Sequence, residues 1–123
     1  MLYVRQNRIS MKKLVLGAAL AGWGLSVLPA AAQNYEIPQS LWEHPRSGMA
    51  ILSQKPLREC MQAWMAAPGA RLVIHHGVGD EEQLRAAELR YWLVSLAVEG
   101  DRIELMDDLR QNESINVEIR ELQ

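Results

Sequence analysis

Apolar side chains recur every three or four positions between residues 53 and 65, the clearest periodic pattern in the chain. They are Leu57, Cys60, Met61, Trp64 and Met65. This spacing places them on one face of an amphipathic helix. Ser53 is a suitable N-cap, and the first turn holds Pro56, whose missing N–H costs nothing there. The pattern predicts a helix over residues 53–65, ended by Pro68-Gly69.

A second helix is predicted from Asp80 to about Val98. Its first turn carries three consecutive carboxylates, which the helix macrodipole favours at this end. Its inner face is expected to hold Ala86, Leu89, Leu93 and Leu96 or Ala97. Gly100 suits the position just past the end of this helix.

Short β-rich or alternating runs predict the strands. Residues 71–75 (RLVIH) lie between glycine-containing turns, which is typical of a buried strand. Residues 102–106 (RIELM) and 115–119 (INVEI) alternate between apolar and polar. A shorter first strand is expected at Leu41–Glu43, after a polar tail over residues 33–40. The order β-α-β-α-β-β predicts an α/β (α+β) fold, a two-layer sandwich with both helices on one face of a small sheet.

The first 32 residues have the pattern of a secretory signal. Lys12 and Lys13 precede an uncharged run over residues 14–28, and small residues follow as far as Ala32. We expect cleavage between Ala32 and Gln33. Met11 begins a complete signal by itself, so it is an alternative start.

An uncleaved anchor is the alternative to cleavage. Residues 14–32 form an uncharged run of 19 residues, close to the roughly 20 that span a bilayer. Glycines and a proline interrupt this run, and the small residues at its end favour cleavage. No cysteine follows these small residues, so no lipid anchor is expected. The sequence therefore predicts a periplasmic protein with one domain over residues 41–123.

Charge and cysteine content narrow the function classes. All fifteen acidic residues but only nine of the thirteen basic ones follow Ala32, which gives residues 33–123 a formal charge of −6. This excess argues against nucleic acid or anionic lipid as a partner, because both favour Lys and Arg.

The single cysteine, Cys60, cannot form an internal disulfide. Its apolar neighbours predict a buried, inert thiol.

Three segments resemble the OmpA-like domain, a peptidoglycan-binding module of outer-membrane porins, lipoproteins and flagellar stator proteins. Residues 85–103 (RAAELRYWLVSLAVEGDRI) resemble its R-A-x-x-V-x-x-Y-L-V-x-x-G-V-x-x-x-R-I stretch. Residues 68–77 (PGARLVIHHG) resemble the strand before its G-H-T-D signature, and residues 116–119 (NVEI) resemble its closing R-V-E-I strand. The resemblance runs from about Leu41 to Ile119.

The resemblance implies a ligand site around Arg85. In the family, an Asp neutralises the ammonium of diaminopimelate while an Arg meets its carboxylate. Arg85 occupies the Arg position, but Gly79 stands where the Asp would fall, one residue before Asp80. Asp80 or His76 is the candidate to bind the ligand together with Arg85. The family's asparagine-containing loop and its later glycine-rich segment are both missing here.

Other chemistry has little support in the sequence. His75 and His76 are neighbours on a predicted strand, so they point to opposite faces and cannot chelate one metal. The carboxylates Asp107 and Asp108 lack the spacing of a calcium loop. No arrangement of nucleophile and base is apparent, so neither an enzyme, a metal nor a cofactor is expected. Trp42, near the leading segment, is the candidate for an exposed partner contact.

Two functions remain open. The first is a non-catalytic accessory domain that binds another envelope protein, and the second is a peptidoglycan stem-peptide module that uses Arg85. The missing loops and the acidic charge favour the accessory domain, because peptidoglycan is itself anionic. The oligomeric state is not predicted.

Overall fold

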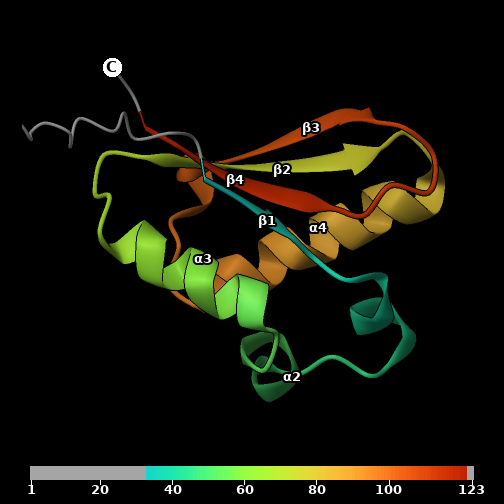
Figure 1. Ribbon diagram of the computed structural model, residues 1–123, viewed down its shortest axis with the longest axis horizontal. Coiled ribbons are helices and arrows are strands. Elements are labelled where there is room, and N and C mark those ends of the chain that lie inside the picture. Colours follow the sequence, from blue (N-terminus) through green and yellow to red (C-terminus); the bar gives the residue numbers. More distant parts are fainter. Residues whose placement is uncertain (1–32, 122–123) are drawn as a thin grey trace, which may run out of the picture. The chain divides into compact units, whose positions relative to one another are not determined.

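The computed structural model describes residues 33–121, which form a four-stranded mixed sheet with helices (Figure 1). The predicted signal over residues 1–32 lies outside the described part. In chain order the elements are β1 (Gln33–Glu36), η4 (Gln39–Glu43), α2 (Gly48–Leu52), α3 (Lys55–Met65), β2 (Arg71–Gly77), α4 (Asp80–Ser95), η5 (Gly100–Arg102), β3 (Ile103–Leu109) and β4 (Asn116–Arg120).

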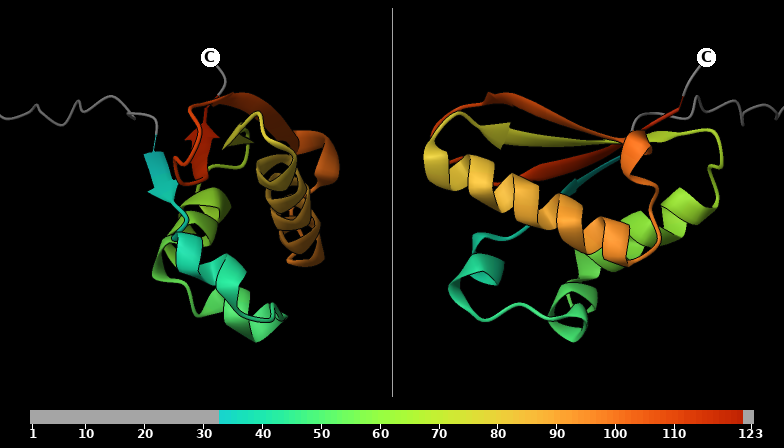
Figure 2. Two further views of the ribbon diagram at one scale, coloured as in Figure 1. Left: turned by 90° about the vertical axis from the view of Figure 1, so that its right-hand side faces the viewer. Right: turned by 180° about the vertical axis from the view of Figure 1, so that it is seen from behind.

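The sheet has the strand order β1-β4-β2-β3. β4 pairs antiparallel with both β1 and β2, whereas β2 and β3 run parallel. Parallel neighbours need a crossover, and α4 supplies it. α3 and α4 cover the same face of the sheet, as Figure 2 shows. The predicted mixed α/β class is confirmed.

The core lies between this helical layer and the sheet. The largest side chains that are fully buried include Ile37, Ile51, Leu57, Cys60, Leu72, Ile74, Leu89, Leu93, Val98 and Val117. Cys60 is buried, as predicted, and burial raises the pKa of its thiol to about 12. Among residues 33–121, no helix combines the length and the hydrophobicity needed to cross a bilayer.

The first strand lies earlier than the sequence suggested. β1 falls in the expected tail and pairs with β4 in the register Tyr35↔Val117, and the pairing extends to a 2.8 Å bond from the Ile37 amide to the Ile115 carbonyl. The predicted strand at Leu41 is instead the 3₁₀ turn η4. In this turn the Leu41 amide donates to the Pro38 carbonyl at 3.1 Å, and Leu41 and Trp42, although adjacent, are both buried.

The ends of both predicted helices also differ. The first begins at Lys55, two residues later than predicted, and α2 is a separate short helix before it that was not predicted. Ser47 caps α2 by accepting from the Ala50 amide at 3.1 Å, and Ser53 ends α2 instead of capping α3. α4 stops at Ser95, and Ala97 adopts a left-handed φ of 79° where glycine is usual. Gly100, expected to end this helix, begins η5.

Candidate functional site

α4 has two apolar faces. One packs into the core through Ala86, Leu89 and Leu93. The other is a stripe of exposed side chains that recur at intervals of three and four residues. This exposed stripe consists of Leu84 (71% exposed), Ala87, Tyr91 (64%) and Val94 (41%). An outer helix normally turns a polar face to water, so this stripe is the most unusual surface feature of the helical layer.

A groove of about 560 Å³ runs beside the N-terminal half of this stripe. We call it the α4 groove, and its lining residues are Trp42, Arg46, Glu81, Leu84, Arg85, Ala87 and Glu88. The apolar members form one part of its surface, and two arginines and two glutamates form the rest. The groove therefore combines apolar area with balanced charge.

Arg46 fixes the segment after η4 against α4. Its guanidinium donates to both Glu88 oxygens, at 2.8 and 3.0 Å, and lies 5.5 Å from the centre of the Trp42 ring. Trp92 donates its indole N–H to the same Glu88 carboxylate at 3.1 Å. The hydrogen bond from Arg46 holds the pKa of Glu88 below its usual value. These contacts keep both charges of the pair engaged inside the domain.

Arg85 lies between the α4 groove and a smaller hollow of about 70 Å³. Its guanidinium donates to Glu81 at 2.8 Å and to Gln39 at 3.2 Å. Glu81 is 73% exposed, so an incoming carboxylate could displace it. Glu82 lines the smaller hollow together with Arg85. Arg85 is therefore placed where a surface ligand could reach it.

The other two predicted ligand-binding residues, Asp80 and His76, do not line either hollow beside Arg85. Asp80 lines a different depression, with Gln83 and Leu84, because residues five apart on a helix do not share a face. His76 is 6% exposed, and its Nδ1 lies 2.7 Å from the Gly77 carbonyl oxygen. Glu82 was not predicted as a site residue. It stands three residues before Arg85, so helical spacing alone places the two side chains on the same face of the helix.

The prediction of an exposed Trp42 is wrong. Its side chain is only 9% exposed and belongs to the core cluster. η4 turns Trp42 inward beside Leu41, and Arg46 lies over the ring. One part of the ring still lines the α4 groove. The exposed apolar contacts come from α4 instead, through Leu84 and Tyr91.

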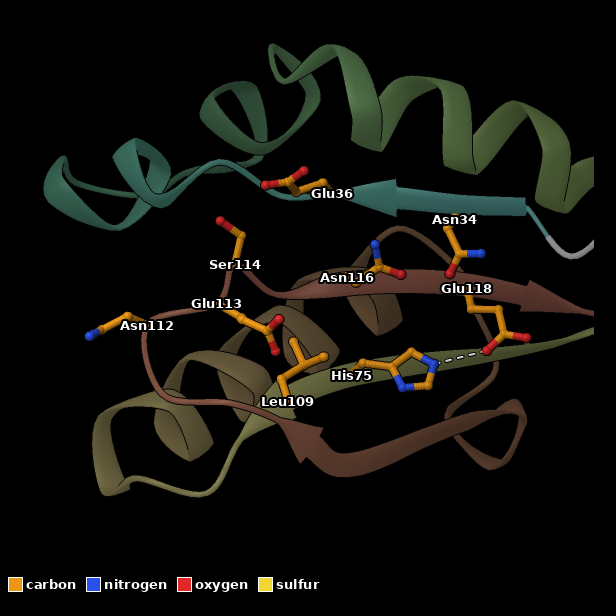
Figure 3. Close-up of a pocket in the computed structure, with 9 residues that line it drawn as sticks. All are labelled: Asn34, Glu36, His75, Leu109, Asn112, Glu113, Ser114, Asn116 and Glu118. Carbon is orange, nitrogen blue, oxygen red and sulfur yellow. Dashed lines mark hydrogen bonds and ion pairs between the residues drawn. The ribbon is translucent and has the colours of Figure 1, made fainter.

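A second hollow lies on the sheet face opposite the helices (Figure 3). It measures about 740 Å³, and its lining residues are Asn34, Glu36, His75, Leu109, Asn112, Glu113, Ser114, Asn116 and Glu118. As predicted, His75 and His76 point to opposite faces. His75, however, is not free in solvent, since carboxylates flank both of its ring nitrogens.

Metal ligands and a reactive thiol would each extend the chemistry of the two hollows. Within residues 33–121, no three His, Cys, Asp or Glu side chains are arranged to hold a metal ion. Cys60 is buried away from both hollows. The side chains that line the two hollows can supply apolar contact, hydrogen bonds and ion pairs.

No family model, curated protein or solved structure matches this chain.

Proposed function

We propose that this chain is a non-catalytic accessory domain of the bacterial cell envelope, built on an OmpA-like scaffold, which binds another envelope protein. The observation that carries this proposal is the exposed apolar stripe of α4 beside the α4 groove. The β-α-β-α-β-β order supports the scaffold, and the missing family loops favour a protein partner over the cell-wall ligand.

The partner is an amphipathic helix with basic residues beside its apolar stripe. Positions 84, 87, 91 and 94 have the three-and-four spacing by which one helix packs along another. The ion pairs Arg46–Glu88 and Arg85–Glu81 balance the charge of the groove itself, so the long-range field that a partner meets comes from the net charge of −6 on residues 33–123. That charge attracts a basic partner and opposes association of two copies.

Site-specific photocrosslinking in the native cells tests this proposal. A photoreactive amino acid replaces Leu84 or Tyr91, and the matched control replaces Met65, which is 72% exposed on α3. We expect one defined adduct from the α4 positions and none from Met65, with the crosslinked peptide belonging to an amphipathic helix rich in Lys or Arg. A product of two copies of this chain, or equal labelling from Met65, would reject the proposal.

Peptidoglycan binding is the second candidate, because Arg85 is half-buried at a surface hollow beside displaceable Glu81. In this reading Arg85 binds a stem-peptide carboxylate, and Glu82 takes the role that the resemblance gave to Asp80. Sedimentation of residues 33–123 with purified sacculi tests it. Binding that is lost in Arg85→Ala and kept in Arg90→Ala supports this candidate, whereas protein that stays in the supernatant rejects it.

Export to the periplasm with signal cleavage at Ala32 is part of the proposal. It is supported by β1, which begins at Gln33, so the expected cut would leave the whole sheet intact. Amino-terminal sequencing of the protein recovered from the periplasm should begin at Gln33. A start upstream of Leu14, together with recovery from membranes, would instead favour the uncleaved anchor.

A further inference from the structure

His75 links three strands on the outer face of the sheet. Its Nδ1 lies 2.9 Å from both oxygens of Asp108 on β3, and its Nε2 lies 2.8 Å from Oε1 of Glu118 on β4 (Figure 3 draws the contact with Glu118). The His75 side chain is 14% exposed. These contacts join residues 33 and 43 positions apart.

Two carboxylates at these distances require two N–H donors. A neutral imidazole has one N–H, and only the imidazolium has two. Removal of a proton therefore leaves one carboxylate facing a nitrogen lone pair. Both contacts are hydrogen bonds only while the ring is charged.

The two carboxylates differ in their freedom to move away. Glu118 is 13% exposed and accepts from Arg120 at 3.0 and 3.2 Å, so it has a second partner and little room. Asp108 is 44% exposed, and within residues 33–121 its side chain forms no hydrogen bond or ion pair other than those with His75. Asp108 is thus the group that leaves when His75 loses its proton.

Asp108 lies at the end of β3 where the pairing with β2 is irregular. β3 is an edge strand that pairs only with β2. Its register shifts between His75 and Gly77, where Leu109, not Asp108, becomes the partner of Gly77. The interaction with His75 is therefore the side-chain contact that holds this irregular end of the strand.

We propose that His75 is a proton-operated latch, which holds the C-terminal end of β3 on the sheet when charged and releases residues 107–113 when neutral. Three of these residues, Leu109, Asn112 and Glu113, line the outer hollow on the sheet face opposite the helices, so their release would widen that hollow. This inference stands apart from the proposed function, because the latch and the α4 groove lie on opposite sides of the sheet.

The surroundings of His75 favour its charged form. Besides Asp108, three carboxylates are near the ring: Glu118, Glu36 and Glu113 line the same hollow as His75, and the guanidinium of Arg120 lies beside Glu118. Burial disfavours the charged ring, but the hydrogen bonds to Glu118 and Asp108 outweigh it, so the pKa of His75 is raised above 6.5. The latch is therefore closed below the raised pKa of the His75 ring and opens above it.

Amide hydrogen exchange of residues 33–123 from pH 6 to pH 9, corrected for intrinsic rates, tests the latch. Between the ordinary and the raised pKa of the ring, the opening constant of residues 107–110 should rise about tenfold per pH unit and then level off. His75→Gln should remove this dependence, and the control His44→Gln, at an exposed histidine, should keep it. Wild-type protection that does not change with pH would overturn the proposal.

A measurement on the wild-type protein covers the case in which His75→Gln fails to fold. The imidazole resonances of His75 and the amide resonance of Asp108 are followed in one NMR titration. The latch requires one shared midpoint above pH 6.5. Different midpoints would overturn it, since release of Asp108 would then not follow the proton on His75.

Discussion

At the scale of single residues, Arg102 has the most concentrated set of contacts in the domain. Its guanidinium donates to the carbonyls of Pro68 and Ala70 at 2.8 and 2.7 Å and lies 4.0 Å from the centre of the Trp64 ring. It also pairs with Glu99 at 2.8 Å. One side chain therefore closes the α3–β2 turn against the start of β3.

Replacement of Arg102 should be costly for that reason. We expect Arg102→Ala to lower the free energy of unfolding by about 2 kcal/mol, because two carbonyls lose a charged donor and Trp64 loses its cation–π contact. Arg102→Lys should recover little, since an ammonium cannot reproduce the planar fork. Urea unfolding measures both. The control Arg71→Ala removes one bond to the Asp101 carbonyl and should cost clearly less; equal costs would contradict this prediction.

Among the elements, α4 ends at a residue poorly suited to its backbone. Ala97 has a φ of 79°, and the amides of Val98 and Ala97 donate to the carbonyls of Leu93 and Val94 at 3.0 Å each. These bonds form a Schellman motif, in which glycine is the preferred residue.

Ala97→Gly should stabilise the protein by about 1 kcal/mol, because glycine adopts this conformation without the steric cost of a Cβ. Ala87→Gly, on the exposed face within α4, is the matched control and should destabilise by a similar amount. Thermal unfolding followed by circular dichroism measures both changes. A loss of stability in Ala97→Gly would contradict the left-handed ending.

The first strand gives a second prediction at this scale. Tyr35 faces the helical layer and packs against the core, whereas Asn34 faces the outer hollow. Tyr35→Ala should lower the free energy of unfolding by about 2 kcal/mol through lost burial, and Asn34→Ala by less than about 0.5 kcal/mol. Chemical denaturation distinguishes them. Two equally neutral substitutions would mean that residues 33–36 form a tail instead of a strand.

For the whole molecule, the ion pairs predict how stability depends on pH. Hydrogen bonds from Arg46 and Arg120 lower the pKa values of Glu88 and Glu118, so these carboxylates stabilise the fold above pH 4.5 and lose that contribution as the pH falls. The raised pKa of His75 stabilises it below pH 6.5, and this contribution is lost as the pH rises.

The free energy of unfolding should therefore be greatest between pH 4.5 and 6.5. Urea unfolding at a series of pH values measures the curve. His75→Gln should flatten its alkaline side, and Glu118→Gln should reduce the slope of its acid side. A wild-type stability that stays constant from pH 6 to pH 9 would show that the environment of His75 is the same in the folded and unfolded chain.

Much of the fold, but less of the candidate site, could be predicted from the sequence. The stripe from Leu57 to Trp64 and the buried run around Ile74 have local periods that report helix and strand directly. Trp42 was misplaced because a buried 3₁₀ turn leaves the same short apolar signal as a strand. Leu84 and Tyr91 lie within a predicted helix, but their exposure depends on which face of α4 meets the sheet.

The sequence by itself determined the mixed α/β class, the buried state of Cys60 and the opposite directions of His75 and His76. These properties follow from spacing along a few turns or residues. Only the tertiary structure decided that β1 pairs with β4 and that His75 meets Asp108 and Glu118. Contacts of this kind depend on strand register, which is set when distant segments pack on one core.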